Sequence, residues 1–551
     1  MNSFIRSAAL VLLIPVFALA QTEAGMQQPP PAADASDPRA LSLSLQEAIA
    51  TAVERNLGVQ LERYDYRITG QSAKGAYAPF DWFTSAELST SSSEQPSFAI
   101  VFPSKTERTA FDLGLQHTFA AGGTVGAAFN NDLTNDDRFE DAGVKDVYGS
   151  SLGFSVNQPL LRNFGIDVNR RGIYIARNNL DISGEQFRNQ LMLTVLGVEQ
   201  AYWDLIYARQ ELEVQRASLV LGRDQARITQ IRIDVGASAP LDILQPQVAI
   251  ATREETVILA EAAIRDAEDR LRSLINMDPS EWDRPIVPTE TIDYQPVQLD
   301  LENAVSRALE QRPEVKQIDL LRQNNRAQYV WARNQVLPRL DFNLNYGLTG
   351  QVAGEQIVRD PVTGQPIGTA SSGISDSLQQ VFGLDFPGWT VGLEFGLPIQ
   401  NIGARAEARR AELDLDRAGT EIEFVRQNVV LEVRAAARDI DTAVRSISAT
   451  RVARDAAQRN LEAERKRFEN GMTTNFNVLL IQQDLADARS REIRSLAAYK
   501  KAVATFRRVV GDNLDAHGIV VAMPETFDLP DHRFEDATWL RHHNPAKDLK
   551  K

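Results

Sequence analysis

The sequence predicts an internally duplicated α+β membrane protein, in which long coiled-coil hairpins are connected to β-strands long enough to cross a bilayer. Two patterns lead to this fold class. Apolar residues recur at every seventh position over long stretches, which is typical of helices that pack along one narrow seam. Elsewhere apolar and polar residues alternate strictly, which indicates a strand with one apolar face. Both patterns occur in each half of the chain, so the fold is predicted to be a repeat.

The first helical hairpin is predicted from two series of apolar or small residues spaced by seven. The first series comprises Leu191, Val198, Leu205, Leu212, Leu219, Ala226 and Ile233. The second series comprises Ile243, Ile250, Val257, Ile264 and Leu271. Gly236 lies between them, and glycine suits a reversal of the backbone. We therefore expect an antiparallel coiled-coil hairpin over about residues 173–275, with a first arm of roughly 95 Å.

Three arginines of the first arm, Arg209, Arg216 and Arg223, also recur at every seventh position. Residues with this spacing share one face of a coiled-coil helix. One interpretation is a solvated outer face of the coiled coil, and the other is the lining of a lumen. The sequence alone leaves both interpretations open.

A second hairpin is predicted over about residues 404–511, with its turn at Gly471. One of its series comprises Val433, Ile440, Ile447, Arg454, Leu461 and Phe468, and is interrupted only by the arginine. The two turns align without gaps, residues 233–244 with residues 468–479. The hairpin is therefore predicted to occur twice.

The repeat extends beyond the hairpins. The helical segment Leu43–Val53 returns as Leu299–Leu309, with the same spacing of apolar residues. The first repeat is assigned to residues 41–275 and the second to residues 299–511, because each would hold a helix, strands and a hairpin. Residues 276–298, which contain four prolines, are predicted to link them.

Alternating segments predict the strands. In the first repeat they fall within about residues 82–157, and in the second at about residues 340–348 and 389–397. Strands of nine or ten residues with one apolar face occur in soluble sandwiches and in outer-membrane proteins. Several such strands, with aromatic residues near their ends, favour the outer membrane. The aromatic residues are Trp82, Tyr148 and Trp389. The Gly-, Ser- and Asp-rich segments 91–108, 131–147 and 349–386 are expected to be extracellular loops.

The two ends of the chain are predicted to lie outside this fold. Residues 1–20 have the charged, apolar and small-residue regions of a secretory signal peptide. The alternative is a membrane anchor, which is disfavoured because the apolar run is shorter than the roughly 20 residues of a span. Residues 21–40 are expected to be a disordered leader, and residues 512–551 a polar tail. Beyond residue 20 no apolar run is long enough for a spanning helix, so a membrane crossing would require a closed β-barrel.

Composition excludes several function classes. The net charge of −15 argues against nucleic acid as a partner. The chain has no cysteine, which excludes disulfides and thiolate metal sites. Residues 149–153 match the G-x-S-x-G pattern of a nucleophile elbow, but they lie within an alternating strand instead of a strand-to-helix turn. No phosphate-binding or dinucleotide-binding fingerprint is present, so any energy must come from a partner. His532, His542 and His543 could suggest a metal site, but they lie in a polar tail without fixed geometry. We expect no enzyme, no cofactor and no metal site.

In its order of elements the chain resembles the TolC-like outer membrane efflux proteins, also called outer membrane factors. The duplicated helix, the corners Gln158–Leu161 and Leu397–Ile399, and the two aligned turns carry this resemblance over roughly residues 41–515. It implies a homotrimer in which each protomer adds two β-hairpins to one 12-stranded outer-membrane β-barrel, continuous with a long periplasmic α-helical barrel. Residues 109–130 depart from this pattern and look like an extra hairpin. Three placements are open: it enlarges the barrel, extends the strands or lies outside the barrel.

The resemblance also implies where the functional site lies. The turns at Gly236 and Gly471 would form the periplasmic tip, where the pore narrows. The residues implied at the constriction are Asp242, Gln245, Asn477 and Leu480. The residues implied in the tip turns, where an adaptor docks, are Ile233, Gly236, Phe468, Gly471 and Thr473. Family members commonly have an aspartate where this chain has Asn477, and Tyr and Arg where it has Phe468 and Thr473. A weaker or different link between the hairpins is therefore expected.

The function implied is that of an exit duct in the outer membrane of a Gram-negative bacterium, with a periplasmic extension. The duct would carry small molecules or polypeptides passively in a tripartite efflux or type I secretion system. Its partners would be outer-membrane lipid, a periplasmic adaptor (membrane fusion) protein and an inner-membrane pump of the RND or ABC type. The alternative is a periplasmic coiled-coil adaptor or scaffold protein.

Overall fold

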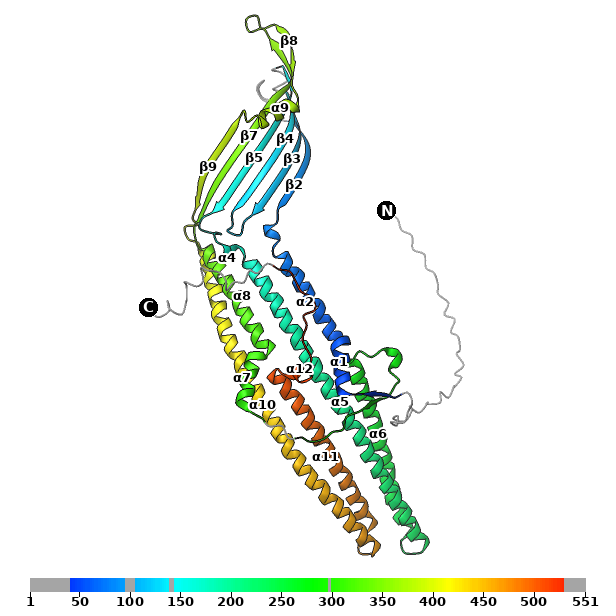
Figure 1. Cartoon of the computed structure of the whole chain (residues 1–551). Coiled ribbons are helices and arrows are strands. Elements are labelled where there is room, and N and C mark those ends of the chain that lie inside the picture. Colours follow the sequence, from blue (N-terminus) through cyan, green and yellow to red (C-terminus); the bar gives the residue numbers. More distant parts are fainter. Residues whose placement is uncertain (1–39, 95–104, 138–142, 296–298, 530–551) are drawn as a thin grey trace, which may run out of the picture.

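The computed structural model describes residues 40–94, 105–137, 143–295 and 299–529. This part of the chain is elongated, with a tilted β-sheet at one end, a layer of helices below it and two helical hairpins at the other end (Figure 1). The expected signal peptide, nearly all of the leader and most of the polar tail lie outside the described residues.

The first half of the chain runs through helices, strands and a hairpin. Its main elements are α1 (Leu45–Arg55), α2 (Leu57–Gly75), β2 (Phe83–Glu94), β3 (Lys105–Thr118), β4 (Thr124–Asp136), β5 (Val144–Pro159), α4 (Ile166–Asn169), α5 (Arg171–Asp234) and α6 (Leu244–Leu274). Ser44 and Glu47 form the capping box that starts α1. Helix α5 has 64 residues, which correspond to about 96 Å.

The second half repeats this order with fewer full-length strands. Its main elements are α7 (Leu301–Gln311), α8 (Pro313–Gln335), β7 (Arg339–Arg359), β8 (Pro366–Ser371), α9 (Ile374–Phe382), β9 (Pro387–Gly396), α10 (Ile402–Glu469), α11 (Asn475–Val510) and α12 (Asn513–Ala516). A small parallel pair, β1 (Leu41–Leu43) with β6 (Ile286–Pro288), ties the start of the first half to the segment that follows α6. Among the described residues, no helix is long and apolar enough to cross a membrane.

The main sheet has the strand order β2-β3-β4-β5-β7, continued by β9 along Arg339–Leu348 of β7 and by β8 at its distal end. All neighbours are antiparallel. Residues 109–130 form most of β3 and β4, which lie between β2 and β5. The expected two β-hairpins per protomer therefore do not describe this sheet, since β3 and β4 add another hairpin within it.

The register places apolar residues on one face of the sheet and polar or small residues on the other. One row of directly paired residues crosses all six long strands and consists of Ala86, Leu113, Phe129, Leu152, Leu348 and Pro387. A neighbouring row on the opposite face consists of Glu87, Asp112, Asn130, Ser151 and Thr349. A one-residue shift at any pair would reverse the faces of the two strands relative to each other, so the alternation fixes the register.

The segments expected to be loops contain regular structure. Strand β7 continues to Arg359, where β8 pairs with it, and α9 packs on β5 and β7. Ser377 on α9 donates to the carbonyl oxygen of Gly350 at 2.9 Å. A Cβ atom at Gly350 would lie 2.1 Å from the Ser377 carbonyl oxygen, so glycine is required there. Backbone pairing and this helix contact outweigh the low strand propensity of these polar segments.

The helices below the sheet form a layer in the order α2, α5, α8, α10 (Figure 1). The largest buried cluster joins α1, α5 and α6, and includes Ile49, Tyr202, Leu205 and Leu271. The Tyr202 hydroxyl donates to the Leu43 carbonyl oxygen at 2.9 Å. Apolar burial of this kind contributes about 25 cal/mol per Å² and holds α1 and α6 against α5.

The last described residues pack back against the first half. Phe527 lies beside Tyr66, with ring centroids 5.8 Å apart, and occupies the space next to Gly70. A Cβ atom at Gly70 would lie 2.0 Å from the Phe527 ring. Glu525 forms an ion pair with Arg67 at 3.0 Å. Helix α2 is thus completed by residues from the far end of the sequence.

The arginines that recur every seventh residue in α5 bind glutamates with the same spacing in α6. The pairs are Arg209–Glu268 at 3.1 Å, Arg216–Glu261 at 3.1 Å and Arg223–Glu254 at 2.8 Å. Their exposure increases toward the tip of the hairpin, from buried Glu268 to exposed Arg223. The arginine series therefore ties the two arms of the first hairpin together. Arg216 and Arg223 are also partly exposed, so the solvated face and the lumen lining both stay predictions.

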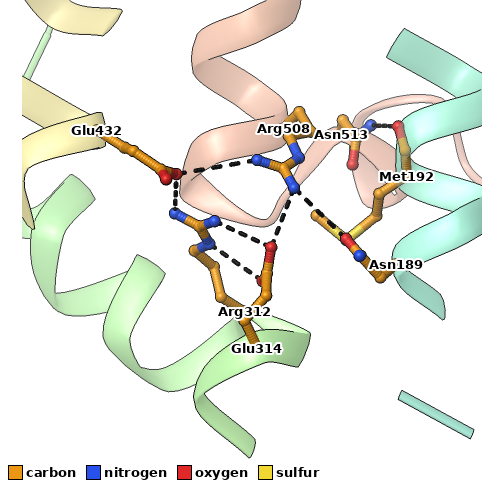
Figure 2. A network of polar contacts seen from close by, with 7 residues as sticks. All are labelled: Asn189, Met192, Arg312, Glu314, Glu432, Arg508 and Asn513. Carbon is orange, nitrogen blue, oxygen red and sulfur yellow. Dashed lines mark hydrogen bonds and ion pairs between the residues drawn. The ribbon is translucent and has the colours of Figure 1, made fainter. Parts of the chain in front are cut away.

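A polar network joins both halves at the middle of the helical layer (Figure 2). Arg312, between α7 and α8, binds Glu314 at 3.0 Å and Glu432 of α10 at 2.6 Å. Arg508 of α11 also binds Glu314, at 3.0 Å, and donates to Asn189 of α5 at 3.5 Å. Burial opposes ionisation of Glu314, but the hydrogen bond and charge of Arg312 outweigh it and hold the pKa of Glu314 below its ordinary value.

We expect Glu314→Gln to destabilise the protein near neutral pH by about 1–3 kcal/mol, because two arginines lose a charged acceptor. The pKa of Glu314 is lowered on folding, so its contribution is present above its ordinary value of 4.5 and is lost as the pH falls through the folded value. The melting temperatures of wild type and variant should therefore converge in acid. Glu310→Gln, at an exposed glutamate of α7, is the control. A constant difference at all pH values would contradict this assignment.

Candidate functional site

The tips of the two hairpins are built alike. At each tip a glycine with positive φ follows the long helix, Gly236 at 77° and Gly471 at 71°. The amide of the next residue returns to the helix, Ala237 to the Arg232 carbonyl at 2.7 Å and Met472 to the Arg467 carbonyl at 2.9 Å. This is the arrangement by which glycine ends a helix, since it satisfies carbonyls that would otherwise lack a donor.

We expect Gly471→Ala to destabilise the second tip by about 1–2 kcal/mol, because a side chain is strained at this backbone conformation. No atom lies within 4 Å of the position that a Cβ would take, so sterics with neighbours would add nothing. Gly471→Asn should cost less, since asparagine tolerates the left-handed region better. Rates of limited proteolysis at the turn would measure the effect. Equal rates for all three proteins would contradict the prediction.

The residues expected at the constriction lie on the first turns after each glycine. Asp242, in η2 (Pro240–Ile243), accepts a hydrogen bond from the Ala239 amide at 3.1 Å. Gln245 is exposed, and Leu480 is 50% exposed. Asn477 is exposed and donates to Thr473 Oγ1 at 3.1 Å. All four side chains are thus available on the surface of one protomer.

The two tips are linked through the backbone of Phe468. Arg232 of α5 donates to the Phe468 carbonyl oxygen at 3.1 Å, and its guanidinium lies 4.5 Å from the centroid of the Phe468 ring. Gln225 of α5 donates to Asn475 Oδ1 of α11 at 2.7 Å. Thr473 instead binds Glu464 Oε1 at 2.6 Å, within the second hairpin. The link between hairpins therefore uses Phe468 but not Thr473.

A buried arginine joins the hairpins farther from the tip. Arg253 of α6 is 4% exposed and donates to Gln482 Oε1 at 3.0 Å and to the Leu479 carbonyl oxygen at 3.4 Å. It also donates to the Ser218 carbonyl oxygen of α5 at 2.9 Å. A Cβ atom on Gly222 would lie 2.6 Å from Arg253 Nη1, so glycine gives the guanidinium its space. Burial lowers the pKa of Arg253.

The sequence reasoning missed Arg232, Gln225 and Arg253. Arg253 could have been noticed, because it is the one charged residue in a series spaced by seven. The other members of the series are Pro246, Ala260, Ala267 and Leu274. A single charge in such a series indicates a special partner, as Arg454 does in the second hairpin, where it binds Glu492 at 3.4 Å. Arg232 and Gln225 lie among many polar residues of α5 and give no comparable signal.

The contacts between the two tips are noncovalent. They are hydrogen bonds from Gln225 and Arg232 and the cation–π contact between Arg232 and Phe468. Within the described residues, no group of His, Asp and Glu side chains is arranged to hold a metal ion. Residues 149–153, which match a nucleophile pattern, lie inside β5, where Ser151 accepts a hydrogen bond from Asn130 at 3.3 Å.

A sheet with one apolar face, joined to long paired hairpins, fits the class of outer-membrane proteins that the alternating strands predict. Residues 134–277 and 304–512 match the sequence model of the outer membrane efflux protein family. Because these segments make up more than half of the chain, the protein belongs to this family. It is a TolC-like transport protein of the outer membrane of Gram-negative bacteria.

Individual relatives are distant. Outer membrane protein TolC of Vibrio cholerae is 21% identical over 356 residues, covering 63% of this chain and 75% of that protein. The alkaline protease secretion protein AprF of Pseudomonas aeruginosa is 23% identical over 377 residues, covering 66% of this chain and 70% of that protein. The CmeC outer membrane channel of Campylobacter jejuni has a TM-score of 0.62 at 14% identity, over 85% of this chain and 86% of that chain. The outer membrane protein VceC of Vibrio cholerae has a TM-score of 0.61 at 14% identity, over 85% of this chain and 96% of that chain. These two structures show a shared fold.

Proposed function

We propose that the protein is the outer-membrane exit duct of a tripartite export system and works as a homotrimer. The sheets of three copies would close one barrel in the outer membrane, and the helices would form a tube that extends into the periplasm. A periplasmic adaptor would connect the tube to an inner-membrane pump of the RND or ABC type. Transport through the duct would be passive, and the cargo would be small molecules or polypeptides.

The observation that carries this proposal is the apolar face of the sheet. Trp389, Leu393 and Phe395 of β9 are 74%, 67% and 64% exposed in one protomer, which a water-soluble protein of this size rarely tolerates. The opposite face is polar, as the lining of a water-filled pore would be. A periplasmic adaptor or scaffold does not contact lipid and would not need an exposed apolar sheet face. No observation therefore favours that alternative.

The hairpin tips would form the closed periplasmic end of the duct. In this proposal Asp242, Gln245, Asn477 and Leu480 line the constriction, because they lie on the first turns after the two glycines. The residues proposed to meet an adaptor comprise Ile233, Gly236, Phe468, Gly471 and Thr473. Opening would separate the two hairpins of each protomer, which requires the contacts of Arg232, Gln225 and Arg253 to break.

Membrane fractionation followed by an unboiled detergent gel tests the proposal. The expected result is a band in the outer-membrane fraction near three times the chain mass of 61.2 kDa, which collapses to the monomer on boiling. Purified trimers should then conduct ions in planar bilayers, and Leu480→Ala should raise the conductance if the tip limits it. A soluble periplasmic monomer would contradict the proposal.

A further inference from the structure

The sheet of one protomer has two open edges. Among the described strands, β2 pairs only with β3, and β9 pairs only with β7. All residues of β2 are exposed, as are most of β9. An edge strand presents a row of unpaired N–H and C=O groups, and hydrocarbon offers these groups no partner. Both edges therefore need another strand in the membrane.

The two edges match each other. Each strand in the order β2-β3-β4-β5-β7-β9 is antiparallel to the next one. The first and the sixth strand, β2 and β9, therefore run in opposite directions. Strand β9 of one copy can therefore continue the antiparallel sheet into β2 of a second copy. The apolar side chains of β9 have odd numbers, such as Val391 and Leu393, and those of β2 have even numbers, such as Ala86 and Leu88. Pairing odd with even numbers keeps the apolar face continuous across the junction.

The hairpin of β3 and β4 resembles the neighbouring strands of the sheet on both faces. Leu113 and Phe129 stand in the apolar row between Ala86 and Leu152. On the opposite face a row of small, directly paired residues crosses all six strands and consists of Ser85, Gly114, Ala128, Gly153, Gly347 and Gly388. Glycines at matched levels allow a sheet to curve toward that face. The hairpin thus shares both the lipid-compatible face and the curvature of its neighbours.

The width of the sheet matches that of the helical layer below it. Strands about 4.8 Å apart and tilted by about 40° each take roughly 6 Å of a barrel's circumference, so six strands cover roughly 38 Å and four cover roughly 25 Å. The layer α2, α5, α8 and α10 has four helices side by side (Figure 1). At about 9 Å between axes, four helices cover roughly 36 Å. Six strands continue this layer without narrowing, whereas four would not.

We infer that each copy contributes six strands to the barrel, through β9–β2 pairing with the next copy, so that a trimer closes eighteen strands instead of twelve. This inference rests on the proposed trimeric duct. Because barrel diameter grows roughly in proportion to strand number, the section in the membrane would be about 1.5 times as wide as a 12-stranded one. The duct would then keep nearly the width of its helical tube up to the cell surface, and would admit bulkier cargo there.

Paired cysteines test the inference, because the native chain has none. In the full-length protein in outer membranes, Ala86→Cys is combined in turn with a cysteine at each residue of β9 on the apolar face (387, 389, 391, 393 and 395), and an oxidant is added. One of these pairs, set by the register of the junction, should give covalent trimers on denaturing gels. Ala86→Cys with Gly392→Cys is the control, because those side chains point to opposite faces and should not link. No covalent oligomer from any of the five pairs would overturn the proposed junction.

A second set of pairs tests the place of the hairpin. Ala127→Cys with Phe154→Cys joins β4 to β5 and should form a disulfide within one chain. Leu88→Cys with Leu152→Cys should not link, because about 14 Å of sheet separates β2 from β5. A disulfide in that pair, or twelve strands counted in the purified trimer by electron cryo-microscopy, would overturn the inference. A stable outer-membrane trimer with twelve strands would leave the proposed duct intact, whereas a soluble monomer would remove both.

Discussion

Glu268→Ala is expected to lower the free energy of unfolding by about 3–5 kcal/mol, the range found when one partner of a buried ion pair is removed. Glu268 is 5% exposed and binds Arg272 at 3.0 Å and Arg209 at 3.1 Å. It also accepts a hydrogen bond from the Ile286 amide at 3.1 Å. The variant would leave a buried guanidinium and a buried amide without this acceptor, at the point where α5, α6 and β6 meet.

Loss of helical circular dichroism on heating would measure this effect. Glu213→Ala is the matched control, because Glu213 pairs with Arg216 at 3.7 Å but its side chain is 73% exposed. An exposed pair of this kind contributes little, since water already solvates both charges. Equal melting temperatures for the two variants would show that Glu268 does not hold the first hairpin together.

If the protein is the proposed duct, Arg253→Met is expected to open its periplasmic end while changing overall stability little. The variant removes the donors that join α6 to Gln482 and Leu479 of α11. Hydrogen bonds from a charged group contribute about 1.5–3 kcal/mol, so the balance between closed and open tips should shift by about tenfold to a hundredfold. Stability changes less, because the variant also removes a buried charge that burial disfavours.

Open probability of single channels in planar bilayers would measure this shift. Arg223→Met is the matched control, since Arg223 is an exposed arginine that binds Glu254 within the same hairpin. Gly222→Ala should act in the same direction as Arg253→Met, because its Cβ would displace the guanidinium. If Arg253→Met and Arg223→Met conducted alike, the buried arginine would have no part in closing the tip.

The sequence predicted the elements whose pattern is local. Apolar residues at every seventh position located the long arms, and α5 and α10 contain those positions. Alternation located apolar residues on strands, and in the structure these residues share one face of the sheet. The family was identified from the order of these elements, and the family comparison confirms it.

What the sequence did not predict depends on partners that are distant along the chain. Nothing local to β3 and β4 indicates that they lie between β2 and β5, because pairing order is decided by neighbours in space. Strand β8 and helix α9 were missed because their polar residues resemble a loop. The glutamates that bind the arginines of α5 carried the same seven-residue spacing, so that ladder was detectable, whereas the contact of Arg232 with a backbone carbonyl was not.

The return of residues 525–529 to helix α2 makes the packing of the first half depend on the far end of the chain. The chain is synthesised from its amino end, so α2 exists long before Phe527, which fills the space beside Gly70. Until Phe527 arrives, Tyr66 and Leu180 of this cluster lack their apolar neighbour. The first half therefore completes this part of its packing only when the far end of the chain is in place.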